Sequence, residues 1–280
     1  MTNAALHCDH GAVKMVVGQT PTPLEKVTPL RIPERWKQLV AEEFGSATSI
    51  EHVRFFPSKK NQVSLLTLGT TNGPRYVIAK YFVWGECDHE WNVLEQAWAA
   101  GLDVPQPIAR RENICLLEHV RGSNLRTVAE RTPERINGRA IGQWLARFHN
   151  RFQRNDVTLL KGDCMPPNFI LRDDDTVCGI DFEEAREGDP LDEVIEAATT
   201  LLTLPPWPES PAAQGIQHAR DLITGWQEAR PAATPDLTGL PRQIAASLGS
   251  RRAWQPDRAD QLHLLAVQLT AMPEIFTTLH

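Results

Sequence analysis

The chain has 280 residues, 41% apolar and 23% charged, which is ordinary globular usage and excludes a fibrous or wholly disordered chain. Its 29 Lys and Arg against 35 Asp and Glu give a net charge of −6, so it lacks the positive field typical of nucleic-acid-binding proteins. No apolar run approaches the roughly 20 residues of a membrane-spanning helix, and no secretory signal pattern opens the chain. We therefore expect a cytoplasmic protein with neither a nucleic-acid partner nor a membrane partner.

The cysteines exclude two further classes of protein. There are five, an odd number, and they are widely scattered: Cys8, Cys87, Cys115, Cys164 and Cys178. This pattern argues against a disulfide framework, and no C-x-x-C pair indicates a zinc site.

The first half of the chain predicts an arm, a helix and a small sheet. Residues 1–32 contain several prolines and little periodic apolar pattern, so we expect an N-terminal arm. A proline and helically spaced apolar residues then predict a helix over 33–44. Three segments have strand character, and a tight turn at 70–74 joins the last two: 50–56, 62–68 and 75–83. A helix from about 88 to 100 and a strand at 114–118 complete this half.

The second half is mainly helical. The predicted helices lie near 134–152, 191–203, 212–228, 239–249 and 257–270. Residues 161–181 interrupt them with a loop, a strand at 169–171, a polar turn and a second strand at 177–180. Strands first and helices afterwards predict an α+β fold of two lobes with a crevice between them. We expect the lobes at 33–118 and 123–280, joined by a hinge at 119–122.

The clearest chemical signal lies in this interruption. Asp163 and Asn168 are five residues apart on a loop whose two prolines prevent a helix, and Asp181 follows the second strand. Because the two strands form a hairpin, we expect the three side chains to converge at its open end. Two carboxylates and one amide suit a hard cation such as Mg²⁺, with one carboxylate left to accept a proton. Phosphoryl transfer requires this combination of groups.

Further landmarks stand around this loop in a fixed order. They are Lys80 in Y-V-I-A-K, Glu90 ahead of G-L-D-V-P at 101–105, L-L-E-H-V-R-G at 116–122, L-A-R-F-H at 145–149 and G-D-P-L-D at 188–192. Together with D-x-x-x-x-N and I-D-F-E, they resemble the aminoglycoside phosphotransferase and choline kinase-like family. The resemblance covers about residues 50–205. It implies a two-lobed, protein-kinase-like α+β fold, with a small antiparallel sheet in the N-terminal lobe and a mainly helical C-terminal lobe.

The same resemblance implies an activity and the residues that perform it. The activity is the ATP- and Mg²⁺-dependent transfer of a γ-phosphate to a hydroxyl of a small molecule, with GTP as an open alternative to ATP. Asp163 would be the catalytic base, and Asn168 and Asp181 would bind Mg²⁺. Lys80, held by Glu90, would neutralise the charge of the phosphates.

The remaining nucleotide contacts are also implied by resemblance. Backbone groups of Glu118 and Val120 would pair with the adenine edge, and Ser58, between the first two strands, would contact the β- or γ-phosphate. Lys161 stands where the family usually has the histidine of H-G-D. We expect this lysine to change the packing of the loop while activity is retained; an alternative is that its ammonium faces the metal or a substrate anion.

Acidic residues follow the predicted metal ligand. Residues 181–196 contain eight acids and one base, and Glu183, Glu187 and Asp192 among them would attract a cationic acceptor such as an aminoglycoside or another amine. Trp207, in a proline-rich loop, would form a wall of the acceptor site. The alternative is that these acids favour the start of the helix at 191–203 or are simply solvated.

Two departures from protein kinases leave alternative functions open. The first hairpin has no glycine-rich loop, and the chain has neither H-R-D nor A-P-E, so protein-kinase activity is disfavoured. The missing glycine loop and Lys161 also allow a second class of function, a nucleotide-binding pseudokinase that regulates a partner. Nucleotide stabilisation that ignores magnesium would indicate this second class.

Overall fold

The computed structural model describes residues 33–58, 60–83, 87–155, 157–204, 212–230, 237–272 and 275–276. The arm expected at 1–32 and the predicted acceptor wall at Trp207 lie outside these residues. Within the described residues, no helix is long and apolar enough to cross a membrane.

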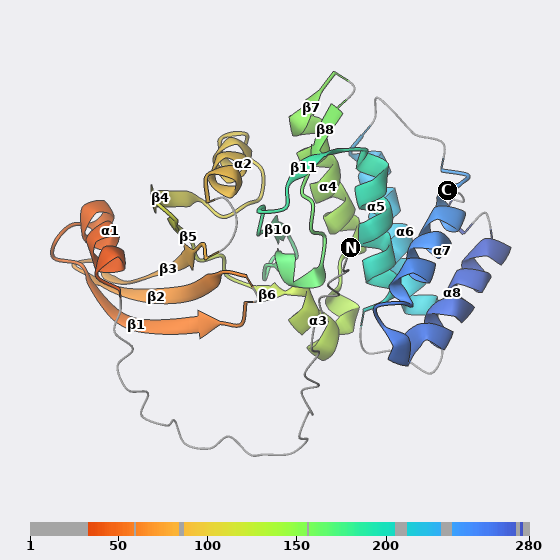
Figure 1. Cartoon of the computed structure of the whole chain (residues 1–280), viewed down its shortest axis with the longest axis horizontal. Helices are drawn as coiled ribbons and strands as arrows, with labels where there is room; N and C mark the ends of the chain where they lie inside the picture. The colour runs from red at the N-terminus through yellow and green to blue at the C-terminus, as the bar shows by residue number, and fades with distance from the viewer. Residues whose placement is uncertain are drawn as a thin grey trace, which may run out of the picture.

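One side of the molecule is an antiparallel five-stranded sheet with two helices (Figure 1). In spatial order the strands are β1 (Ser49–Phe56), β2 (Gln62–Thr70), β3 (Gly73–Tyr81), β5 (Ile114–Glu118) and β4 (Pro107–Arg111). The helices are α1 (Glu34–Phe44) and α2 (Cys87–Ala99). We call these seven elements the sheet lobe.

Side chains alternate along each strand between the two faces of this sheet, and the two faces belong to different hydrophobic cores. Ile114 and Leu116 of β5 share a core with Trp36 of α1, whereas Cys115 and Leu117 belong to the larger core that includes α2. Successive side chains of a strand point to opposite faces, which separates the two sets. Lys80 of β3 is paired in register with Cys115, so the lysine lies on the α2 face.

The rest of the described chain is mainly helical, and we call it the helical lobe (Figure 1). Its helices are α3 (Leu125–Arg131), α4 (Gly138–Phe152), α5 (Pro190–Leu202), α6 (Ala212–Glu228), α7 (Leu240–Arg251) and α8 (Ala259–Ala271). Helices α4 and α6 pack closely because glycines face the partner backbone: a Cβ at Gly142 would collide with the carbonyl of Leu222. A Cβ at Gly225 would likewise collide with the carbonyl of Arg139.

Two small antiparallel sheets and three 3₁₀ turns complete the helical lobe. One sheet contains β10 (Val177–Gly179), β9 (Phe169–Leu171) and β6 (Ser123–Asn124). The other contains β11 (Arg186–Gly188), β8 (Val157–Leu160) and β7 (Gln153–Arg154). The 3₁₀ turns are Pro133–Arg135, Pro166–Asn168 and Pro256–Arg258. An aromatic cluster of Trp144, Phe148, Phe169 and Phe182 packs α4 against the β9–β10 hairpin.

The predicted α+β architecture is confirmed, and the differences are local. The helix expected from residue 134 begins at Gly138, because the side chain of Asn137 caps it by accepting a hydrogen bond from Ala140 N at 3.0 Å. Helix α3 was not predicted; it has seven residues and is capped in the same way by Asn124. The strands β4, β6, β7, β8 and β11 were also not predicted, and each has at most five residues.

Candidate active site

Lys80 is the centre of a buried ionic cluster that joins three parts of the fold. The lysine is 5% exposed, and its Nζ lies 2.6 Å from Oε2 of Glu90 and 2.7 Å from Oδ1 of Asp181. Oε2 of Glu183 is 3.7 Å away. Glu90 belongs to the first turn of α2, and Asp181 follows β10 in the helical lobe. One ammonium therefore connects the sheet, α2 and the helical lobe.

The three carboxylates of this cluster outnumber its lysines, even when Lys60, 3.5 Å from Oε1 of Glu183, is counted with Lys80. Burial alone would lower the pKa of Lys80, but the charges of Glu90 and Asp181 outweigh burial and raise this pKa, so the ammonium stays charged. Burial raises the pKa of Glu90, and the neighbouring charge of Asp181 adds to this shift. Glu90, Asp181 and Glu183 each bring an oxygen within 4.8 Å of the others'. Such an oxygen set, with excess negative charge, fits a divalent cation.

The turn between β1 and β2 forms a second polar link to the helical lobe. Asn61 is 6% exposed, and its Nδ2 donates to Oε2 of Glu183, while its Oδ1 accepts from Val83 N at 3.1 Å. Lys60 donates to Glu184 and lies 3.5 Å from Oε1 of Glu183. Glu183 is therefore held by the sheet lobe on two sides.

The loop after β8 positions Asp163 and Asn168 through short-range hydrogen bonds. Oδ1 of Asp163 accepts from Met165 N at 3.0 Å, which closes a turn at the aspartate. Asn168 ends the 3₁₀ turn Pro166–Asn168; its Nδ2 lies 3.5 Å from the carbonyl oxygen of Asp163, and its own carbonyl accepts from Ile180 N at 3.0 Å. Residues 168 and 181 therefore stand at the same open end of the β9–β10 hairpin.

Lys161 fastens this loop to the backbone of Asp181. It is fully buried, and its Nζ donates to the carbonyl oxygens of Asp163 at 2.6 Å and Asp181 at 3.0 Å. The ammonium also lies 5.4 Å from the ring centroids of Phe169 and Phe182. The geometry favours changed packing over the alternative that Lys161 faces the metal or a substrate anion, because its donors are used inside the protein.

Two backbone conformations support the same loop. Gly162 has a φ of +94°, and a Cβ there would collide with the carbonyl oxygen of Glu184. Asp181 has a φ of +64°, a region that residues other than glycine seldom occupy and that occurs at functional sites.

Glu193, near the start of α5, holds the loop from beneath. It is 2% exposed and accepts from Lys161 N at 3.0 Å and Gly162 N at 2.6 Å. Its Oε2 lies 2.7 Å from Nε2 of His149, whose Nδ1 lies 3.1 Å from Nε1 of Trp226. An indole N–H can only donate, so Nδ1 accepts, and Nε2 carries the proton that Glu193 accepts. Burial alone would raise the pKa of Glu193, but the hydrogen bonds from His149 and the two amides outweigh burial and lower it.

Replacing Glu193 with alanine is expected to lower the free energy of unfolding by about 3–5 kcal/mol, because three buried donors lose their acceptor. A folded-state pKa below the ordinary value of 4.5 contributes stability above that pH, and this stability is lost as the pH falls through the folded-state pKa. The wild type should therefore lose stability more steeply below about pH 4.5 than Glu193→Gln does. Urea unfolding monitored between pH 7 and pH 3.5 measures both effects. Glu187→Ala, at an exposed acid of β11, is the matched control and should change nothing.

With Asp163 as the predicted catalytic base, Lys161→Met is expected to reduce turnover on the order of 10²-fold, because the loop of Asp163 loses its bond to Asp181 and a misplacement of about 1 Å has this effect. Lys161→His supplies a hydrogen-bond donor from its ring, so its turnover should remain within about tenfold of that of the wild type. Steady-state kinetics of the three proteins give the comparison. Equal turnover of the methionine variant and the wild type would show that Lys161 does not position the loop.

The predicted hinge residues differ in the backbone groups they leave available. The amide of Glu118 donates to the carbonyl of Gln106 at 2.9 Å, so this amide is not available to adenine; a contact through the carbonyl stays a prediction. Val120 is 6% exposed, and among the described residues no backbone hydrogen bond outside the helices and strands involves it. Its contact with adenine stays a prediction.

The other predicted residues fall into separate environments. Ser58 is exposed, and its Oγ accepts from Asn61 N at 3.3 Å, so its hydroxyl stabilises the β1–β2 turn; phosphate contact stays a prediction. Glu183 belongs to the Lys80 cluster, whereas Glu187 and Asp192 are exposed on β11 and the first turn of α5. Glu183 therefore has partners within the protein, whereas contacts of Glu187 and Asp192 with an acceptor stay predictions.

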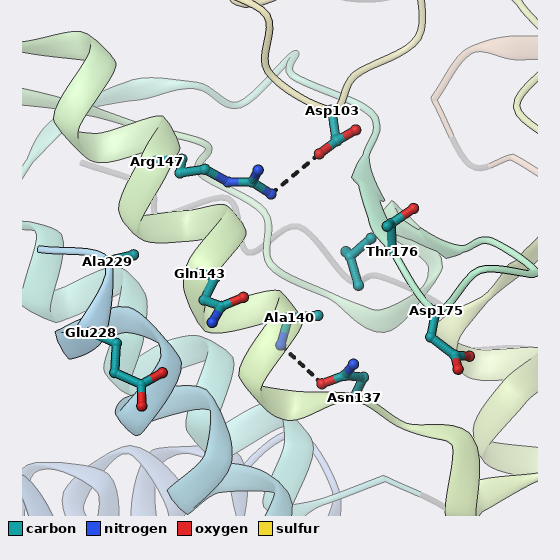
Figure 2. A pocket seen from close by; sticks show the side chains of 10 residues that line it. Asp103, Asn137, Ala140, Gln143, Arg147, Asp175, Thr176, Glu228 and Ala229 are labelled. Atoms are coloured by element: carbon teal, nitrogen blue, oxygen red, sulfur yellow. Dashed lines mark hydrogen bonds and ion pairs between the residues drawn. The ribbon is translucent and has the colours of Figure 1, made fainter.

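A cavity of about 470 Å³ in the helical lobe is a different site (Figure 2). Its lining comes from α4, α6, the turn before β4 and the β9–β10 hairpin, and it includes none of the candidate residues above. Each of its acids forms an ion pair with an arginine: Asp103 with Arg147 and Arg172, Asp175 with Arg135, and Glu228 with Arg139. Because these charges are balanced within the protein, the cavity is not a candidate for phosphate chemistry.

Sequence reasoning missed three contributors to the site. Glu193 was counted only among the acids of residues 181–196, and no role was predicted for Lys60 or Asn61. Their roles depend on contacts across 31 to 124 residues of chain, for which the sequence carries no local signal.

The fold of this chain is similar to that of several solved kinase structures. No protein-family model matches the sequence, and no curated protein matches it. Among solved structures, choline kinase from Cryptosporidium parvum Iowa II has 8% sequence identity and a TM-score of 0.58, over 85% of this chain and 95% of that one. The amicoumacin kinase hAmiN, in complex with AMP-PNP, Ca²⁺ and Ami, has 12% identity and a TM-score of 0.58, over 85% and 93%.

A third neighbour extends the range of substrates named in these structures. Spectinomycin phosphotransferase APH(9)-Ia, in complex with ADP and spectinomycin, has 9% identity and a TM-score of 0.56, over 89% of this chain and 94% of that one. At these identities the likeness concerns the fold, and the match spans nearly the whole of each neighbour. The chain therefore has the two-lobed, protein-kinase-like fold of the choline kinase and aminoglycoside phosphotransferase structures, as its sequence motifs predict.

Proposed function

We propose that this protein is an ATP- and Mg²⁺-dependent kinase that transfers the γ-phosphate to a hydroxyl of a small molecule. One observation carries the proposal: a buried lysine of the sheet lobe contacts both a helix glutamate and an aspartate at the mouth of a hairpin in the helical lobe. A purely structural ion pair needs one carboxylate for each lysine. Here three carboxylates, Glu90, Asp181 and Glu183, lie together and leave negative charge for a cation to balance. The fold shared with solved small-molecule kinases supports the same activity.

The donor set near Asp181 fits magnesium, which prefers carboxylate and amide oxygens. Asp181 and Asn168 would hold the ion, and the ion would supply positive charge to the phosphates. Lys80, kept in place by Glu90, would bind phosphate oxygens and neutralise their charge. Asp163 would orient the acceptor hydroxyl and take its proton, since its carboxylate is half-buried on a fixed loop.

The acceptor in this proposal is a hydroxyl compound that carries an amine or another cationic group. The exposed acids Glu187 and Asp192, together with the net charge of −6, support such a partner. Glu183, held by Lys60 and Asn61, instead contributes to the ionic cluster. We place the nucleotide-binding lobe at 33–118, the hinge at 119–122 and the catalytic lobe at 123–280.

Thermal-shift titration and an ADP-release assay test the proposed function. ATP with magnesium should raise the Tm more than ATP alone, and a panel of amino alcohols, aminoglycosides and peptide antibiotics should include a compound that stimulates ADP release. Lys80→Met should lose both responses, whereas Lys37→Met, at an exposed lysine of α1, should keep them. Stabilisation by ATP that ignores magnesium, with no ADP release across the panel, would instead indicate a nucleotide-binding regulatory protein. Phosphate incorporated into protein substrates would indicate a protein kinase.

A further inference from the structure

Two cysteine side chains meet in the sheet lobe. The Sγ atoms of Cys87 and Cys115 lie 3.1 Å apart, and the side chains are 6% and 2% exposed. Both thiols are free. Because a disulfide bond has an S–S length of about 2.05 Å, the two atoms need to approach by only about 1 Å to bond.

The pair is built into the support of the Lys80 cluster. Cys87 is the first residue of α2, three residues before Glu90, so both lie on one side of the first turn of the helix. Cys115 is the register partner of Lys80 across β3 and β5. A bond between the thiols would therefore join the turn that carries Glu90 to the strand beside Lys80.

The two thiols differ in reactivity, which assigns them different roles. The hydrogen bond from Cys115 lowers the pKa of Cys87, and the guanidinium of Arg110 adds to this shift. The hydrogen bond with Cys87 and burial raise the pKa of the Cys115 thiol. Cys87 also stands at a helix N-terminus, where the amides favour a thiolate. Cys87 is thus the attacking thiol, and Cys115 is the resolving one.

We propose that Cys87 and Cys115 are a thiol–disulfide modification site that a hydroperoxide oxidises and a dithiol reduces. The Cys87 thiolate attacks one peroxide oxygen, the O–O bond breaks, and the other oxygen leaves as an alcohol, or as water from hydrogen peroxide. The resulting sulfenic acid of Cys87 is attacked by the sulfur of Cys115; the S–S bond forms and water leaves. Two thiols thereby lose two electrons, which the peroxide accepts. This proposal does not depend on the proposed kinase activity.

The bond should change the local stability of α2 while leaving the fold intact. It closes the chain between residues 87 and 115, and such a cross-link stabilises chiefly by restricting the unfolded state. We expect the Tm to rise on the order of 5 °C. Amide hydrogen exchange within α2 should slow, because the first turn of the helix can no longer open away from β5. Exchange in α8, a helix of the helical lobe, should not change.

Stepwise oxidation of the full chain with hydrogen peroxide tests the proposal. Thiols counted after denaturation should fall from five to three, and peptide mapping should identify a Cys87–Cys115 cross-link that dithiothreitol removes. Cys87→Ser and Cys115→Ser should each abolish the cross-link and the rise in Tm. Cys178→Ala, at a buried thiol of β10, is the matched control and should keep both.

Three results would overturn the proposal. The first is stepwise addition of oxygen to single cysteines without loss of a thiol pair. The second is a cross-link that maps to Cys8, or to Cys164 or Cys178. The third is formation of the mapped bond only after denaturation, which would show that the native geometry does not present the two thiols to each other.

Discussion

Asp163→Asn is expected to lower kcat by about 10²–10⁴-fold, because the amide cannot accept the proton of the acceptor hydroxyl. The asparagine can keep the hydrogen bond from Met165 N that Asp163 receives, so the loop should keep its shape. The Tm and the response to ATP with magnesium should therefore match those of the wild type. The measurement is steady-state ADP release with the acceptor identified from the panel.

The control for this experiment is Asp173→Asn, at an exposed aspartate of the nearby β9–β10 turn, which should leave kcat unchanged. Near-full turnover by Asp163→Asn would remove Asp163 from the chemistry and leave its carboxylate as a turn-forming group. A lower Tm together with lost turnover would point to a collapsed loop, and Asp163→Ser would then test whether any short hydrogen-bonding side chain restores the structure.

Asp181→Asn is expected to reduce turnover on the order of 10³-fold, because a divalent ion that stabilises transferring phosphate contributes several kcal/mol. The variant should also lose the part of the ATP-induced Tm shift that requires magnesium, a readout independent of turnover. Lys80 keeps Glu90 as a partner, so the ammonium stays paired and the fold should survive.

Glu183→Gln separates the two carboxylates that share the Lys80 cluster. If Asp181 holds the ion, Glu183→Gln should keep the magnesium-dependent shift, since Glu183 is occupied by Asn61 and Lys60. If Glu183→Gln loses the magnesium-dependent shift and Asp181→Asn keeps it, the ion is held by Glu183, and our assignment to Asp181 is wrong. Thermal-shift titrations of both variants with ATP, with and without magnesium, decide between these outcomes.

Sequence patterns predicted those parts of the protein that depend on local chain. The strand pattern around Lys80 and the helical spacing after Asp88 both correspond to elements of the structure, and the order of motifs indicated the fold. Strand β8, with four residues, and the two-residue β7 offer too few positions for a period to emerge. In the structure β8 pairs with β11, a tertiary contact, and β7 pairs with β8.

The supports of the site could not be predicted for a related reason. Glu193 differs from its acidic neighbours only in facing Lys161 and Gly162, and burial of that side of α5 depends on how α5 packs beneath the loop. The thiols of Cys87 and Cys115 meet because a helix end happens to lie over one face of β5, which spacing along the chain does not reveal. Packing between elements, rather than propensity within them, decides these contacts.

The links between the lobes have a consequence for nucleotide binding. Lys60 and Lys80 contact carboxylates of the helical lobe, and under the proposed function the phosphates of a nucleotide would have to replace Asp181 at Lys80. Under the proposed function, these carboxylates would compete within the molecule with the phosphates of a bound nucleotide. Raising the ionic strength weakens the exposed ion pair of Lys60 far more than the buried ion pair of Lys80. Salt should therefore act mainly on the ion pair of Lys60, and nucleotide on that of Lys80.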